Sequence, residues 1–201
     1  METKKLIDTK NNKTMEEDIK KCIEVLRNGG LILYPTDTVW GIGCDATNAE
    51  AVAKVYALKC RDDSKSLIVL FDTVQRIQGY VERMPDVAYD MMDLTDKPLT
   101  LIIDGAKNMA KNLIATDGSV GVRVTNEKFS HELCARFRKP LVSTSANISG
   151  QPSAAIYSEI SEDIINGVDY VVKYRQDDTT KKKPSSIIKI DNSGLVKIIR
   201  E

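Results

Sequence analysis

The stretch GGLILYPTDTVWGIGCD, residues 29–45, decides the fold class. Its two glycines end a helix that the spacing of apolar residues predicts over residues 15–28, and the capping box Thr14-Met-Glu-Glu17 marks the start of that helix. Leu31-Ile-Leu-Tyr34 is a short apolar run stopped by a proline, which is typical of a buried strand. A helix that passes through two glycines into a buried strand indicates a domain containing both kinds of element.

Helices and strands continue to alternate along the chain. Residues 35–45 are expected to form a loop, and a second capping box, Thr47-Asn-Ala-Glu50, predicts a helix directly after it. Short apolar and β-branched runs predict further strands at 67–71, 99–103, 120–124, 141–142, 170–172, 187–190 and 195–199. Helical spacing predicts helices over 73–79, 85–92, 126–138 and 156–166. We therefore expect an α/β (α+β) fold with one mixed sheet of about seven strands flanked by helices.

The domain count follows from the length and from the placement of polar segments. The chain has 201 residues, and its one long polar segment, 173–184, lies between two predicted strands. Too little chain follows that segment to fold alone, so it is expected to be a solvated loop rather than a linker. We expect residues 1–201 to form a single domain.

Composition narrows the class of protein. The chain has 29 Lys and Arg against 29 Asp and Glu, and 42% of its residues are hydrophobic, which is typical of globular proteins. No apolar run approaches the roughly 18 residues of a membrane span, and the N-terminus lacks the apolar region of a signal peptide, so we expect a cytoplasmic protein without a membrane contact. The zero formal net charge argues against a surface that coats nucleic acid, because such attraction would require a local basic patch.

The four cysteines carry no pattern of a metal site or of disulfides. Cys22, Cys44, Cys60 and Cys134 stand singly, and His131 is the only histidine that could join them. We expect all four to be small buried hydrophobic residues.

Two segments carry polar groups that packing alone does not explain. In 34–45, two hydroxyls, two glycines and a carboxylate follow a buried strand, which is where α/β proteins bind ligands. A tight turn in which Thr36 and Thr38 satisfy the backbone is the alternative. In 58–65, three cations could clamp a polyphosphate, although a solvated face neutralised by its own aspartates would give the same pattern.

A third polar segment, 139–153, places hydroxyl and amide side chains directly after a predicted strand. These neutral groups suit phosphate and carboxylate oxygens. A nucleophilic serine lacks support, because His131 would have to serve as its base and no nucleophile-elbow pattern surrounds these serines.

Five motifs, in order along the chain, resemble the YrdC-like family, the threonylcarbamoyl-AMP synthases, in their short single-domain form. They are YPTDTVWGIGCD at 34–45, Lys-x-Arg at 59–61, GVRV at 121–124, STSANISG at 143–150 and PSSII at 184–188. The resemblance implies a twisted sheet with a concave, basic cavity. It also implies a nucleotidyltransferase that makes L-threonylcarbamoyl adenylate from L-threonine, bicarbonate and ATP, releasing pyrophosphate, for the threonylcarbamoyladenosine modification of tRNA.

The resemblance assigns roles to individual residues. Catalytic positions are Lys59, Arg61, Ser145 and Asn147. ATP-contacting positions are these four together with Lys65, Ser119, Ser153 and Arg200, and L-threonine positions are Thr38, Arg123, Ser143 and Ser185. Mg²⁺ on the triphosphate is expected, without an assigned ligand. A tRNA or double-stranded RNA could contact the cavity mouth, and a threonylcarbamoyl-transfer protein would take the adenylate onward.

The sequence departs from the family pattern at several places, among them Ser186 in place of a threonine. Asp62 and Ser66 each stand where the family usually has a proline, and Thr95-Asp96-Lys97 stands in place of Trp-Pro-Gly. Asp62 beside the basic clamp could weaken phosphate binding. The alternative function is therefore a YrdC-like module that binds double-stranded RNA or tRNA without synthase activity.

Overall fold

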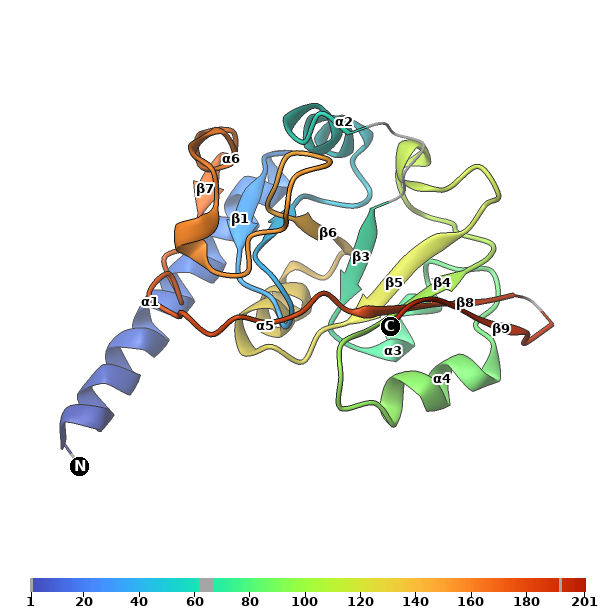
Figure 1. The fold of residues 1–201 in the computed structure, drawn as a ribbon, viewed down its shortest axis with the longest axis horizontal. Helices are drawn as coiled ribbons and strands as arrows, with labels where there is room; N and C mark the ends of the chain where they lie inside the picture. Colours follow the sequence, from blue (N-terminus) through green and yellow to red (C-terminus); the bar gives the residue numbers. More distant parts are fainter. Residues whose placement is uncertain (1, 62–66, 192) are drawn as a thin grey trace.

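Nine strands form one mixed sheet in the part of the chain that the structure, a computed structural model, describes: residues 2–61, 67–191 and 193–201. The strands are β1 (Ile32–Tyr34), β2 (Gly41–Gly43), β3 (Ile68–Phe71), β4 (Leu99–Ile103), β5 (Val120–Val124), β6 (Leu141–Ser145), β7 (Tyr170–Val171), β8 (Ser186–Ile190) and β9 (Val196–Arg200). Their spatial order is β7-β1-β2-β6-β3-β5-β4-β8-β9. The predicted α/β fold with a single mixed sheet is confirmed, with nine strands in place of about seven (Figure 1).

Strand β6 joins the two halves of the sheet. Its residues 141–143 pair antiparallel with β3, while Thr144 and Ser145 pair antiparallel with Ile42 and Gly41 of β2. The strand is longer than the predicted 141–142, so the serines of the third polar segment begin within the sheet. Parallel pairs occur between β1 and β7, β3 and β5, and β4 and β8.

Strand β2 occupies part of the segment predicted as a loop. Its sequence, Gly-Ile-Gly, is too short and too rich in glycine to give a strand signal. The glycines are required because a Cβ at Gly43 would lie 2.8 Å from the Tyr34 ring and 2.9 Å from the Val142 carbonyl oxygen. Glycine at this position therefore lets β2 fit between β1 and β6.

The helices are α1 (Glu2–Arg27), α2 (Ala49–Leu58), α3 (Val74–Ile77), α4 (Asp86–Asp93), α5 (Lys128–Phe137) and α6 (Glu162–Asn166), with two short 3-10 helices, η1 (Lys111–Leu113) and η2 (Tyr157–Glu159). The prediction of a start at the Thr14 capping box was wrong, because α1 runs through it. The lysine, glutamate and leucine of the preceding residues favour helix and override that local signal. The single helix predicted over 156–166 is replaced by η2 and α6, since Ile160 between them is extended and buried.

The N-cap of α2 is Asn48 rather than the Thr47 of the predicted capping box. The Asn48 side-chain oxygen accepts hydrogen bonds from the backbone N–H groups of Glu50 and Ala51, at 3.0 and 3.1 Å. Thr47 instead donates its hydroxyl to Asp45 Oδ1 at 2.6 Å. The loop from β2 is thereby fixed before the helix begins.

Helices α1 and α5 lie against each other beside the sheet, and the N-terminal half of α1 projects away from the body of the protein (Figure 1). Ile19, Cys22 and Leu26 of α1 are buried. Arg136 of α5 donates to both carboxylate oxygens of Glu16, at 2.7 and 2.8 Å. None of the described helices is both long and apolar enough to cross a membrane.

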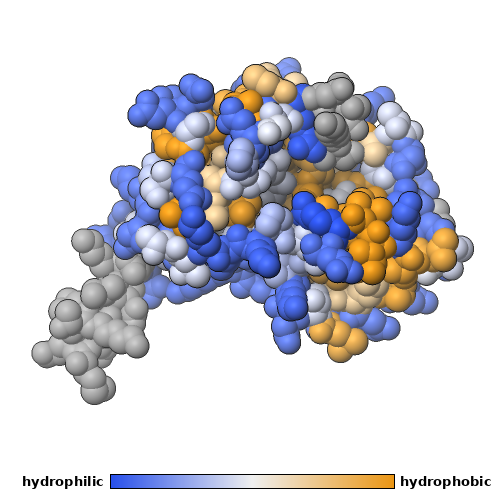
Figure 2. Space-filling model, in the orientation of Figure 1, coloured by the Kyte–Doolittle hydropathy of each residue, from blue (hydrophilic) through white to orange (hydrophobic). Residues whose placement is uncertain are grey.

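Three of the four cysteines are buried and free, as expected, whereas Cys60 is exposed. Cys60 lies after the end of α2 with a positive φ of 48°, so the chain turns outward there. Exposed apolar side chains gather at the sheet edge on Leu195, Val196, Ile198 and Ile199. Figure 2 shows hydrophobic colouring over β8 and β9.

Candidate functional site

A cleft of about 220 Å³ lies over the junction of β2, β6, β3 and β5. Its lining brings together eight of the twelve residues that the sequence assigned to the site: Thr38, Arg61, Arg123, Ser143, Ser145, Ser153, Ser185 and Arg200. These residues come from segments far apart in the sequence. The sheet pairings, above all those of β6, place them at one position.

The turn after β1 carries a directed chain of hydrogen bonds. Thr36 Oγ1 donates to the Val39 carbonyl oxygen at 2.7 Å and accepts from the Thr38 backbone N–H at 3.0 Å. Because the single proton of Thr36 is used, the hydroxyl of Thr38, 3.0 Å away, donates to Thr36. The Thr38 hydroxyl oxygen is therefore left as an acceptor, and Nη1 of Arg123 donates to it at 3.2 Å. Thr36 satisfies the turn, as one interpretation of this segment predicted, and Thr38 lines the cleft, where its role in ligand binding stays a prediction.

Arg123 on β5 forms a buried cationic part of the cleft wall. Its Nη1 donates to Thr38 Oγ1 at 3.2 Å, and its Nη2 lies 3.3 Å from Asp37 Oδ1. The side chains of Arg123 and Asp37 are 4% and 14% exposed. Burial raises the pKa of the Asp37 carboxyl, and the nearby Arg123 opposes that rise.

Lys59 is almost fully buried beneath the loop that follows β6. Its Nζ donates to the carbonyl oxygens of Ser145 and Asn147, at 2.5 and 2.6 Å, and its own carbonyl oxygen accepts from the Ser149 N–H at 2.8 Å. Burial, and then the like charge of Arg61, lower the pKa of Lys59 to about 8. Lys59 does not line the cleft, and its ammonium ties together the loop that carries Ser145 and Asn147.

Two other predicted residues lie outside the cleft lining. Asn147 donates through Nδ2 to the carbonyl oxygens of Ile148 and Gln151, at 3.0 and 2.7 Å, and its buried Oδ1 has no partner among the described residues. Ser119 donates to Asp117 Oδ1 at 2.6 Å just before β5. Lys65 and the departures Asp62 and Ser66 lie outside the described residues.

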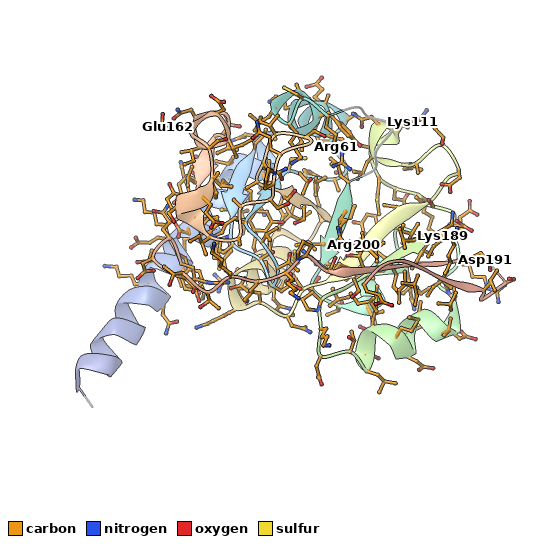
Figure 3. All side chains as sticks on the ribbon, viewed as in Figure 1. Arg61, Lys111, Glu162, Lys189, Asp191 and Arg200 are labelled. Carbon is orange, nitrogen blue, oxygen red and sulfur yellow. The ribbon has the colours of Figure 1, made fainter. Side chains whose placement is uncertain are left out.

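Arg61 and Arg200 lie on opposite sides of the region in front of β3 and β5 (Figure 3). Arg61 follows α2, whereas Arg200 ends β9 and donates through Nε and Nη2 to the Ser185 carbonyl oxygen, at 3.0 and 2.7 Å. The Ser185 hydroxyl lies 2.8 Å from the Thr100 hydroxyl. Burial and the charge of Arg123 lower the pKa of Arg200. The cleft thus concentrates cations although the whole chain is neutral.

Sequence reasoning missed two residues of the site. Trp40 lines the cleft, and its ring lies 5.2 Å from that of Tyr157 at 53°. The position of this aromatic residue inside a glycine-rich segment was the sequence feature that could have indicated a place in the site. No local sequence pattern indicated a role for Asp37, because its ion-pair partner Arg123 is distant in the sequence. Thr95 and Asp96 line a different cavity, which also contains Asp37.

The described residues offer no group of three or more histidine, cysteine or acidic side chains for a metal ion. The cleft lining contains hydroxyls and arginines and, in the described ranges, no carboxylate. Such a lining fits Mg²⁺ only when a phosphate ligand and water supply most of the coordination.

Three comparisons agree on the kind of protein that this chain resembles. The Sua5/yciO/yrdC family model, described as telomere recombination, matches residues 24–201. The threonylcarbamoyl-AMP synthase of Pseudoalteromonas translucida (strain TAC 125) is 36% identical over 160 residues, which are 78% of this chain and 86% of the relative.

Two solved structures share the fold. E. coli YciO matches with a TM-score of 0.79 and 22% identity, over 91% of this chain and 88% of that one. P. abyssi Sua5 complexed with L-threonine matches with a TM-score of 0.76 and 23% identity, over 85% of this chain and 50% of that one. At these identities the two likenesses concern the fold.

Proposed function

The chain belongs to the Sua5/YciO/YrdC family, and from this membership we propose that it is an L-threonylcarbamoyladenylate synthase. It makes L-threonylcarbamoyl adenylate from L-threonine, bicarbonate and ATP, with release of pyrophosphate, for the threonylcarbamoyladenosine modification of tRNA. One observation carries the proposal beyond the family name: a single cleft gathers hydroxyls and three arginines, as a site for two anionic reactants requires.

The reaction has two steps with different demands. The amine of threonine and bicarbonate first give a carbamate with loss of water. An anionic carbamate oxygen then attacks the α-phosphorus of ATP, a new P–O bond forms, and the bond to the β-phosphate breaks to release pyrophosphate. Both reactants carry negative charge, so catalysis consists mainly of positioning and of charge neutralisation.

The chain's own residues divide between these demands. Arg123, whose Nη1 donates to the Thr38 hydroxyl oxygen, receives the threonine carboxylate, and the hydroxyls of Ser143 and Ser185 lie in the same cleft. Arg61, Arg200, Ser145 and Ser153 line the cleft where phosphate oxygens need donors. Lys59 holds the backbone of the Ser145–Asn147 loop in place. Ser119, Lys65, Asn147 and Lys59 itself remain proposed contacts of ATP.

Mg²⁺ bound to the triphosphate would neutralise part of its charge. Because the described cleft lining has no carboxylate, phosphate oxygens and water would coordinate it. We assign no side chain to the metal.

The proposal extends to partners and location. The adenylate must pass to a protein that transfers the threonylcarbamoyl group, and a tRNA could contact the cleft mouth near Lys182 and Lys183, which line the adjoining cavity. Residues 1–201 would act as one domain in the cytoplasm. The family membership and the gathering of three arginines and several hydroxyls in one cleft favour the synthase over an RNA-binding module without activity.

The test is pyrophosphate release from ATP in the presence of threonine, bicarbonate and magnesium. We expect release that depends on threonine. Release no greater than in a threonine-free control would contradict the proposed function.

A further inference from the structure

Asp37 lies in the turn after β1, next to the cleft but outside its lining. Its side chain lines two adjoining cavities, of about 270 and 740 Å³. The nearest cationic atom is Nη2 of Arg123, 3.3 Å from Asp37 Oδ1. Asp37 therefore contacts the arginine from a side that the cleft does not occupy.

Arg123 has a partner at two of its three nitrogens, one by a hydrogen bond and one by an ion pair. Nη1 donates to Thr38 Oγ1, and Nη2 lies 3.3 Å from Asp37 Oδ1 without a hydrogen bond between them; the buried Asp37 Oδ1 and the buried Nε have no hydrogen-bond partner among the described residues. A buried N–H without a partner costs free energy comparable to a lost hydrogen bond. A ligand oxygen in the cleft would remove that cost. The hydrogen bond at Nη1 and the electrostatic attraction of Asp37 at Nη2 both bias the orientation of the guanidinium, and bidentate recognition of a carboxylate depends on that orientation.

We propose that Asp37 is a positioning residue for the synthase reaction: from outside the cleft it orients the guanidinium of Arg123 to receive the threonine carboxylate. The inference rests on the proposed function. Asp37 touches neither substrate. Its negative charge also offsets the repulsion between Arg123 and Arg200, two cations that share the cleft.

Asp37 must be ionised to hold Arg123. The charged groups around it come from every neighbouring segment: Arg123 on β5, Glu127 before α5, Asp96 and Lys97 before β4, Lys182 before β8, and Arg200 and Glu201 at the end of β9. Burial and Glu127 raise the pKa of Asp37, whereas Arg123 and Lys182 lower it. As the pH falls through that pKa the ion pair is lost, so the KM for threonine should rise on the acid side.

The decisive variant is Asp37→Asn, which keeps the shape and removes the charge. We expect the KM for threonine to rise about tenfold and the KM for ATP to change less than about twofold. The acid-side rise in threonine KM should disappear, and Asp37→Glu should recover most of the affinity. The matched control is Asp72→Asn, because Asp72 is 12% exposed and pairs with Arg76 at 2.9 Å away from the cleft.

Three outcomes would overturn the inference. The threonine KM could stay unchanged in Asp37→Asn. It could fall, which would mean that Asp37 competes with the substrate carboxylate for Arg123. Both KM values could instead rise equally with a lower melting temperature, which would indicate a structural role only. If the wild-type protein releases no threonine-dependent pyrophosphate, the proposed function fails, and calorimetric titration of threonine into wild type and Asp37→Asn still decides the inference by the difference in affinity.

Discussion

Replacing Lys59 by methionine separates two roles that a buried lysine can have. Its ammonium makes two hydrogen bonds to carbonyl oxygens, of Ser145 at 2.5 Å and Asn147 at 2.6 Å. Hydrogen bonds to charged groups contribute about 1.5–3 kcal/mol each. Burial, however, shifts the pKa of Lys59 from 10.5 to about 8, which corresponds to a cost of about 3 kcal/mol for keeping the cation inside.

The two hydrogen bonds together contribute about 3–6 kcal/mol and the burial cost is about 3 kcal/mol, so Lys59→Met should lower the free energy of unfolding by no more than about 3 kcal/mol. At about 2–4 °C per kcal/mol, the melting temperature should fall by less than about 12 °C. The Ser145–Asn147 loop would lose its attachment to α2, because both carbonyl groups lose their donor. We therefore expect threonine-dependent pyrophosphate release to fall by about a hundredfold, since small displacements of positioning groups have large effects on rate.

The assay pairs thermal unfolding with steady-state pyrophosphate release. Lys54→Met is the matched control, because Lys54 also donates to a backbone carbonyl, that of Gly29 at 2.9 Å, but lies on the exposed side of α2. The control should keep both stability and activity. A Lys59→Met protein with full activity, or one that loses stability in parallel with activity, would refute the reasoning.

Three further predictions follow from the same geometry. The folded-state pKa of Lys59 lies below its unfolded value, so the cost of burying the ammonium is fully present below about pH 8 and disappears toward pH 10.5. Urea unfolding should therefore show the wild-type protein gaining stability between about pH 8 and 10.5 relative to Lys59→Met. Arg61→Ala should lower kcat/KM for ATP about 10- to 100-fold and leave the melting temperature nearly unchanged, and equal losses for threonine and ATP would speak against a phosphate role. Gly43→Ala should destabilise by about 1–3 kcal/mol because its Cβ meets the Val142 carbonyl oxygen at 2.9 Å, whereas Gly121→Ala, whose nearest contact is 3.5 Å, should be tolerated; chemical denaturation compares the two.

Periodicity in the sequence predicted the elements whose apolar residues face a core. The runs at 99–103 and 120–124 match β4 and β5 residue for residue. Strand β2 could not be predicted in this way, because its pairing depends on glycines that admit Tyr34 and Val142 from either side. The residues that determine where β2 fits therefore belong to the neighbouring strands β1 and β6 and not to β2 itself.

The sequence predicted the site residues whose type the proposed chemistry requires, but it did not predict the contacts that the fold gives to those residues. Arginines and hydroxyls in the five motifs indicated an anion site, and most of them line one cleft. The contact of Lys59 with phosphate stays a prediction, whereas its hydrogen bonds to carbonyl oxygens 86 and 88 residues away were not predictable from the sequence. The pairing of Asp37 with Arg123 depends on the register that brings the turn after β1 beside β5, which no local pattern encodes.

The order of the strands has a consequence for how the protein is made. Strand β1 pairs with β7, so the pairing of Ile32 with Tyr170 requires residue 170 to have been synthesised, and the pairing of β4 with β8 requires residues 186–190. Ser185 and Arg200, which line the cleft, lie directly before β8 and at the end of β9, and these two strands follow all the other strands along the chain. A growing chain can form its first helices and hairpin early, but the cleft is assembled only after β8 and β9 have been synthesised. Pairings between such distant segments also slow folding. A shortened translation product that ends before Ser185 would therefore accumulate as a protein without a working site rather than as a weaker enzyme.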